Sequence, residues 1–248
     1  MPERLAGRPG LSSVRSPRDR IDWAMYVQAL PLYARNLGVM LPPLVAAAIG
    51  IGVDYFGSWF SEPTGGATMG IFVFIERVIW GFGFAVAVIF ADDAWRHNRA
   101  SLQSAWNSAR RNARDILIAV VGFYFLIYVA GLVGGIVPVP YLAEVLQALA
   151  VWAFLYCIPA AAMGGVPAGA AFSVSLQTAR RHPLATLVLT VVSIAVFYGL
   201  AMYLLAHIGV YLGAGFDVAR LLLVAFSLGY IALVLARQYA DFAFRSIW

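Results

Sequence analysis

Residues 101–137 read SLQSAWNSARRNARDILIAVVGFYFLIYVAGLVGGIV. The first part mixes small, aromatic and basic residues, and the part from Ile116 to Val137 contains no charged residue. About 20 apolar residues in an α-helix cross a hydrocarbon core of roughly 30 Å. The stretch therefore predicts a helical membrane protein in which a short basic segment leads directly into a transmembrane span.

Five further segments have the same apolar character. The predicted spans are Leu37–Tyr55, Met69–Ala91, Ile116–Val137, Leu142–Met163, Leu184–His207 and Val218–Ala236. The whole chain is 62% hydrophobic and 12% charged, which lies far outside the range of soluble domains. The predicted fold class is an all-α, multi-pass membrane protein with six transmembrane helices.

Basic residues divide between the two sides of these spans. All 17 are arginine, and none lies in the loops 56–68, 138–141 and 208–217. By the positive-inside rule both termini are cytoplasmic, and we place the protein in the bacterial cytoplasmic (inner) membrane. Topology already explains the net charge of +5, so we expect no nucleic-acid partner. We predict a flexible Arg-rich tail over 1–21, one membrane domain over 22–237 and a short cytoplasmic tail over 238–248.

An internal repeat precedes the odd-numbered spans. The segments Ala29–Asn36, Ala105–Asn112 and Ser175–His182 align without gaps at offsets of 76 and 70 residues. Each copy places small or apolar side chains on one helical face. These faces are Tyr26, Ala29, Leu30, Tyr33 and Leu37, then Leu102, Ala105, Trp106, Ala109 and Ala113, then Phe172, Ser175, Leu176, Ala179 and Pro183.

The pattern predicts three parallel repeats, over about 22–91, 101–163 and 171–236. Each would consist of an amphipathic helix in the cytoplasmic interface followed by a transmembrane hairpin. Basic residues at the ends of these helices are placed to contact the anionic headgroups of membrane lipids. They are Arg35, Arg110, Arg111, Arg114, Arg180 and Arg181.

Two of the repeated segments end in a similar motif, Ala-Arg-Arg-Asn at Ala109–Asn112 and Ala-Arg-Arg-His at Ala179–His182. This arrangement, over about Asp22 to Ala236, resembles a loose group of bacterial six-span membrane proteins built from interfacial-helix and hairpin units. The group includes the membrane domain attached to some glycerophosphodiester phosphodiesterases. The resemblance implies an architecture, and because we find no phosphodiesterase catalytic domain, it carries over no catalytic residue.

We single out four charged residues within the spans, Glu76, Arg77, Glu144 and Arg220. Topology places all four in the outer half of the membrane, where an unpaired charge costs on the order of 3 kcal/mol. They are either a charge-paired cluster that holds the even-numbered spans together or a polar binding or conduction site. Because neighbours on a helix point about 100° apart, we expect Glu76 and Arg77 to have different partners.

No motif for catalysis or metal binding emerges. Cys157 is the single cysteine, and His97, His182 and His207 all lie near predicted interfaces. We therefore predict no catalytic residue, no metal site and no cofactor, while bound lipid is expected. A pigment held by an interfacial histidine is left open.

Two functions are compatible with this sequence. Short outer loops with abundant small and aromatic residues favour a non-enzymatic structural or accessory subunit, packed against other integral membrane proteins, or a lipid-organising protein. The alternative is a channel or transporter for a small solute or lipid that uses the charged residues in the spans.

Overall fold

The computed structural model describes residues 21–61, 67–204, 207 and 215–244, and within these ranges it contains helices and no strand. The helices are α1 (Trp23–Arg35), η1 (Leu37–Met40), α2 (Leu41–Ser61), α3 (Ala67–His97), α4 (Leu102–Arg111), α5 (Ala113–Ile136), α6 (Leu142–Phe154), α7 (Cys157–Ala162), α8 (Ala168–Arg181), α9 (Pro183–Ile194), the π-helical η2 (Ala195–Tyr203) and α11 (Phe216–Phe244). Most of the predicted tail 1–21 and part of the tail 238–248 lie outside the described residues.

Five stretches are long and apolar enough to cross a membrane, by length and composition. They are Leu37–Trp59, Gly70–His97, Ala113–Ile136, Leu142–Ala162 and Phe216–Ala243. A sixth is added if the pair Ala168–Arg181 and Pro183–Gly199, bent by 109°, counts as one span. Within the described residues, the prediction of a helical fold with several helices long and apolar enough to cross a membrane is therefore confirmed.

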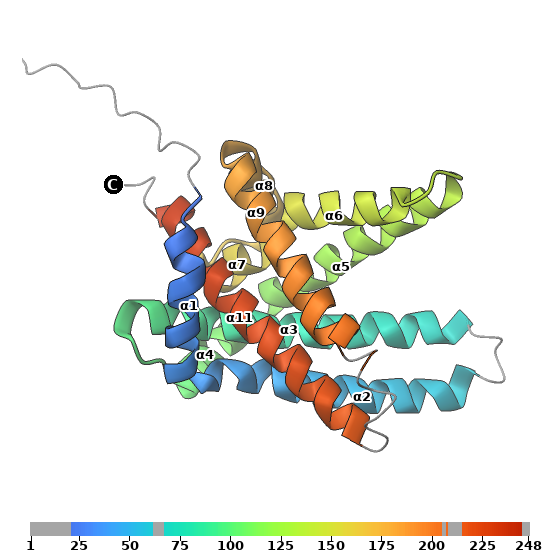
Figure 1. The fold of residues 1–248 in the computed structure, drawn as a ribbon, viewed down its shortest axis with the longest axis horizontal. Coiled ribbons are helices and arrows are strands. Elements are labelled where there is room, and N and C mark those ends of the chain that lie inside the picture. Colours follow the sequence, from blue (N-terminus) through green and yellow to red (C-terminus); the bar gives the residue numbers. More distant parts are fainter. Residues whose placement is uncertain (1–20, 62–66, 205–206, 208–214, 245–248) are drawn as a thin grey trace, which may run out of the picture.

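The 109° bend separates α8, which ends in two arginines, from the uncharged segment Pro183–Gly199. α8 ends at Arg181, and α9 begins at Pro183, a residue that suits the first turn of a helix because its missing N–H is not needed there. The helices α1 and α4 also end in arginine, and Asn36 and Asn112 are the residues that follow them. In Figure 1, α1 runs across the direction of α2 and α3.

Two helices extend beyond their predicted spans. α3 continues past Ala91 to His97, and its last turns carry the ion pair Asp92–Arg96 and the hydrogen bond between Asp93 and His97, both 2.9 Å long. α11 continues through Phe244, so that the first residues of the predicted C-terminal tail are helical. Tyr239, in this helical extension, is buried, and its ring centre lies 6.2 Å from that of Tyr156. Polar residues at a membrane surface can therefore prolong a helix that hydropathy alone would end.

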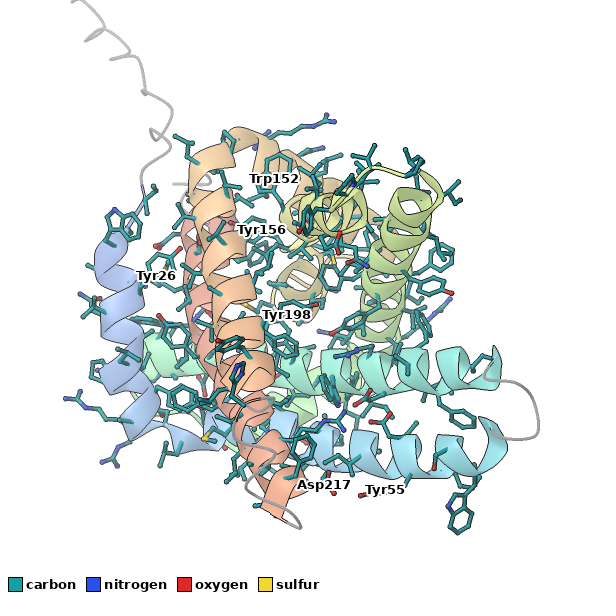
Figure 2. The ribbon with its side chains drawn as sticks, turned by 45° about the vertical axis from the view of Figure 1, so that its right-hand side comes forward. Tyr26, Tyr55, Trp152, Tyr156, Tyr198 and Asp217 are labelled. Atoms are coloured by element: carbon teal, nitrogen blue, oxygen red, sulfur yellow. The ribbon has the colours of Figure 1, made fainter. Side chains whose placement is uncertain are left out.

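The predicted fourth span is interrupted after Phe154. The Ser175 hydroxyl, from α8, donates to the Ala153 carbonyl (2.9 Å) and accepts from the Tyr156 N–H (3.1 Å), so the side chain bridges the break. The Tyr156 hydroxyl in turn lies 3.2 Å from the hydroxyl of Thr186 on α9, and Figure 2 shows Tyr156 inside the helix bundle. Backbone groups freed at the break thus have partners within the protein, as an apolar surrounding requires.

Pairs of neighbouring helices organise much of the described structure (Figure 1). α2 packs along α3, and α11 crosses both of them. α5 packs along α6, and this second hairpin diverges from the first toward its tip. The two hairpins approach where Gly81 of α3 meets the side chains of Val120 and Tyr124, since a Cβ at Gly81 would overlap them.

The helices α1, α4 and α8 bury matched positions. Ala29, Ala105 and Ser175 are each at most 1% exposed, and Tyr33, Ala109 and Ala179 are also buried. By contrast Leu30 and Trp106, which belong to the same predicted apolar faces, are about half exposed. Only part of the apolar face of α1 and of α4 therefore packs against the protein, and Leu30 and Trp106 lie on the molecular surface.

Candidate functional site

Charged side chains of α2, α3 and α11 meet where these three helices cross. Arg220 of α11 donates through Nη2 to Glu76 of α3 (2.9 Å) and to Asp54 of α2 (3.0 Å). We call Asp54, Glu76 and Arg220 the charge cluster. One guanidinium thus joins α11 to the consecutive helices α2 and α3.

Burial differs among the three members of the charge cluster. The Glu76 side chain is 3% exposed, whereas Asp54 and Arg220 are 22% and 23% exposed. A charge removed from water is costly unless it is paired and hydrogen-bonded, and Arg220 supplies that partner to Glu76. The pairing therefore stabilises the crossing of these helices.

A glycine makes this crossing possible. A Cβ at Gly50 of α2 would lie 2.5 Å from Nε1 of Trp80 and 2.9 Å from Cγ of Glu76. Gly50 is one turn before Asp54, so the close approach of α2 to α3 brings Asp54 to the same level as Glu76. A larger residue at position 50 would separate the two helices that present the carboxylates.

Trp80 forms the inner side of the site. The guanidinium carbon of Arg77 lies 4.6 Å from the Trp80 ring centre, and that of Arg220 lies 5.9 Å away. Both distances lie within the range of cation–π attraction. Arg77 therefore contacts the indole while its neighbour Glu76 contacts Arg220, so the two residues have different partners.

A second polar contact lies at the end of the same helices. The Tyr55 hydroxyl of α2 donates to Asp217 of α11 at 2.8 Å. Figure 2 shows these two side chains beside each other, next to the start of α11. Asp217 precedes Arg220 by about one helical turn, so α11 presents an acidic and a basic residue to α2.

The four predicted residues do not form one group. Glu76 and Arg220 are in direct contact, and Arg77 adjoins them through Trp80. Glu144 lies in the first turn of α6, where it is exposed and outside the charge cluster. The basic residues predicted to contact lipid, Arg35, Arg110, Arg111, Arg114, Arg180 and Arg181, are all exposed at or beside the ends of α1, α4 and α8.

Sequence reasoning did not include Asp54 and Trp80 in the site. Asp54 is the penultimate residue of the predicted first span, so a complete count of charges within the spans would have found it. Trp80 follows Glu76 by four residues and therefore shares its face of α3. Its role depends on Gly50 across the helix pair, which no local pattern reveals.

Chemically, the charge cluster can hold α2, α3 and α11 together through paired charges. Across the residues that the structure describes, no three His, Cys, Asp or Glu side chains are grouped to hold a metal ion. Cys157 is a buried free thiol, and its Sγ lies 4.0 Å from the carbonyl oxygen of Ala119.

Comparisons with protein-family models, with curated proteins and with solved structures give no match to this chain.

Proposed function

We propose that this chain is a non-enzymatic structural or accessory subunit of a membrane protein assembly in the bacterial cytoplasmic membrane. The observation that carries the proposal is the uncovered α5–α6 hairpin. Within the molecule only 17% of the apolar stretch of α5 is buried, against 50% of that of α11. The stretch Leu142–Ala162 is 44% buried, but none of its buried residues lies in α6. A hairpin that its own bundle leaves uncovered offers a surface for neighbouring proteins and lipid.

The composition of that hairpin suits protein contact. Phe125 and Tyr128 on α5 are 55% and 57% exposed, and branched residues surround them. A Cβ added at Gly135 would meet open space, so another helix can approach the backbone there. Aromatic side chains with small neighbours are typical of helix contacts within membranes.

The charge cluster supports a structural role for the intramembrane charges. Arg220 is bonded to carboxylates on two other helices, and the most buried of these, Glu76, lies against α2 and α11. Pairing of this kind fixes the positions of helices, whereas a conduction path needs charges that a solute can reach.

Three parallel repeats are part of the proposal. In the first repeat, the Asn36 side chain accepts from Ala100 N (3.2 Å) and donates to Asn98 O (3.1 Å). These two bonds hold the segment that leads into α4. In the second, Asp115 accepts from Ala168 N (3.2 Å) at the start of α8. The starts of the first two hairpins thus hold the entry to the interfacial helix that follows. The matched burial of α1, α4 and α8 supports the same arrangement.

Site-specific photocrosslinking in native membranes tests the subunit role. A photoreactive phenylalanine analogue replaces Phe125, and the matched control replaces Phe84, which is buried. We expect a discrete protein adduct from position 125 and only intramolecular products from position 84. Exclusively lipid adducts from position 125, and from position 128 as a second site, would contradict the proposal.

A channel or transporter is the second candidate. It is favoured by the excess of carboxylate in the charge cluster, since Asp54 and Glu76 share one guanidinium and Asp54 remains 22% exposed. The test is solute or lipid flux in reconstituted vesicles with the double variant Glu76→Gln/Arg77→Met. Flux that disappears in a folded variant would support this candidate, whereas loss of folding or assembly alone would support the structural one.

A further inference from the structure

An apolar groove lies between the first hairpin and the second interfacial helix. Its volume is about 610 Å³, within the range of ~300–1,000 Å³ that binding sites for small molecules occupy. Except for Gln103, the lining side chains are apolar. The groove is lined by Leu41, Pro42, Val45, Ala46 and Ile49 of α2, Val78, Ile79, Phe82, Gly83 and Val86 of α3, Leu102, Gln103 and Trp106 of α4, and Leu117 of α5.

The close seam of α2 and α3 forms the floor of the groove. A Cβ at Gly83 would lie 2.5 Å from Cβ of Ala46 and 2.8 Å from the carbonyl oxygen of Pro42. Trp106 forms a wall, with its ring edge-on to Phe82 at a centroid distance of 6.4 Å. Val45, Ile49 and Leu117 remain 41–57% exposed, so the groove opens to the molecular surface.

Its dimensions match a lipid chain in one leaflet. From Leu41 to Ile49 the groove follows α2 for about 12 Å at ~1.5 Å per residue. One leaflet contributes about half of a roughly 30 Å hydrocarbon core. The lining therefore spans most of one leaflet, with α4 across its end.

Basic side chains stand at that end of the groove. Arg110 follows Trp106 by one helical turn on α4, and Arg114 precedes Leu117 by one turn on α5. Both are exposed. Arg96 and Arg237, in contrast, are each paired with an aspartate one turn away. The groove thus combines an apolar channel with two arginines at the interface.

We propose that the groove binds one anionic phospholipid, with an acyl chain between α2, α3 and Trp106 and its phosphate near Arg110 and Arg114. The inference rests on the proposed placement in the membrane and names the lipid partner of the structural role. Charge complementarity selects the headgroup, because two arginines favour a net negative lipid over a zwitterionic one.

Native mass spectrometry of the full chain tests for this bound lipid. The protein is first exchanged into detergent that contains equimolar phosphatidylglycerol and phosphatidylcholine. We expect one phosphatidylglycerol to be retained preferentially. In the double variant Arg110→Gln/Arg114→Gln, we expect the ratio of bound phosphatidylglycerol to bound phosphatidylcholine to fall by about 25-fold, a factor of about five for each arginine. In Leu117→Trp, which fills the groove, retention of that lipid is lost.

Matched controls come from the third repeat. Leu187 is the counterpart of Leu117 and is 49% exposed, so Leu187→Trp should leave retention unchanged. Arg180→Gln/Arg181→Gln removes the same charge from another interfacial helix and should also have little effect. Equal retention of both lipids, or equal losses in the control and groove variants, would overturn the proposal. The photocrosslinking result at Phe125 does not depend on these outcomes, so the two proposals can fail separately.

Discussion

Arg220 is central to the pairing at the crossing of α2, α3 and α11, because its guanidinium bonds to both Asp54 and Glu76. Its removal leaves two carboxylates beside each other, whereas removal of Glu76 leaves Arg220 still bonded to Asp54. The cost of the two substitutions should therefore differ.

We expect Arg220→Met to lower the free energy of unfolding by about 3–5 kcal/mol, and Glu76→Gln by about 1–3 kcal/mol. In the double variant the loss should be smaller than the sum of the two by ~1–3 kcal/mol. Unfolding of the purified chain in mixed micelles measures all three. Arg77→Met, which removes a cation–π contact, is the control and should cost about 1 kcal/mol. Strictly additive losses would show that Glu76 and Arg220 are not coupled.

Ser175 gives a second prediction for a single residue. Its hydroxyl bonds to Ala153 O and Tyr156 N across the break in the fourth span, so Ser175→Ala leaves both groups without this partner. We expect a loss of about 1–3 kcal/mol in the free energy of unfolding.

The matched control for that substitution is Ser173→Ala, because the exposed Ser173 hydroxyl bonds only locally, to Ala170 O. It should change stability by less than ~0.5 kcal/mol. Thermal unfolding in the same detergent compares the two variants. Equal effects would mean that Ser175 does not stabilise the break.

At the scale of elements, the packing of α2 on α3 depends on where glycine occurs. Gly50→Ala places a methyl group against Trp80 and Glu76, and we expect it to destabilise the chain by about 1–3 kcal/mol. Gly52 has no atom within 4 Å of an added Cβ, so Gly52→Ala should be neutral or stabilising by up to ~1 kcal/mol. Thermal unfolding measures both, and a neutral Gly50→Ala would contradict the close packing.

Much of the element structure could be predicted, because length and apolarity decide which segments cross a membrane. The span Ile116–Val137 differs from the observed Ala113–Ile136 by a few residues. The end of α3 was placed too early because the pairs Asp92–Arg96 and Asp93–His97 prolong the helix through a charged stretch. The break after Phe154 was not foreseen, since it depends on Ser175 from another helix.

The site was predictable to a smaller extent. The cost of charge in a membrane singled out Glu76 and Arg220, which the structure places 2.9 Å apart. It also singled out Glu144, which lies outside the charge cluster. Which charges meet depends on the crossing of α11 over α2 and α3, and that long-range packing leaves no mark in local sequence.

At the scale of the whole molecule, orientation is a separate prediction. Val139, between α5 and α6, is 53% exposed, and Ser104 on α4 is also exposed. In intact cells, Val139→Cys should react with a membrane-impermeant thiol reagent, and Ser104→Cys should react only after permeabilisation. The wild type is the control, because Cys157 is buried. The reverse labelling pattern would invert the proposed topology.

The subunit role itself is tested most directly by the mass of the complex that contains this chain after gentle extraction from its native membrane. Native mass spectrometry gives that mass, and peptide sequencing identifies what accompanies the chain. We predict a discrete complex with at least one other integral membrane protein at fixed stoichiometry. A chain that is released alone, or only as a copy of itself with lipid, under conditions that keep known membrane complexes intact would contradict the account.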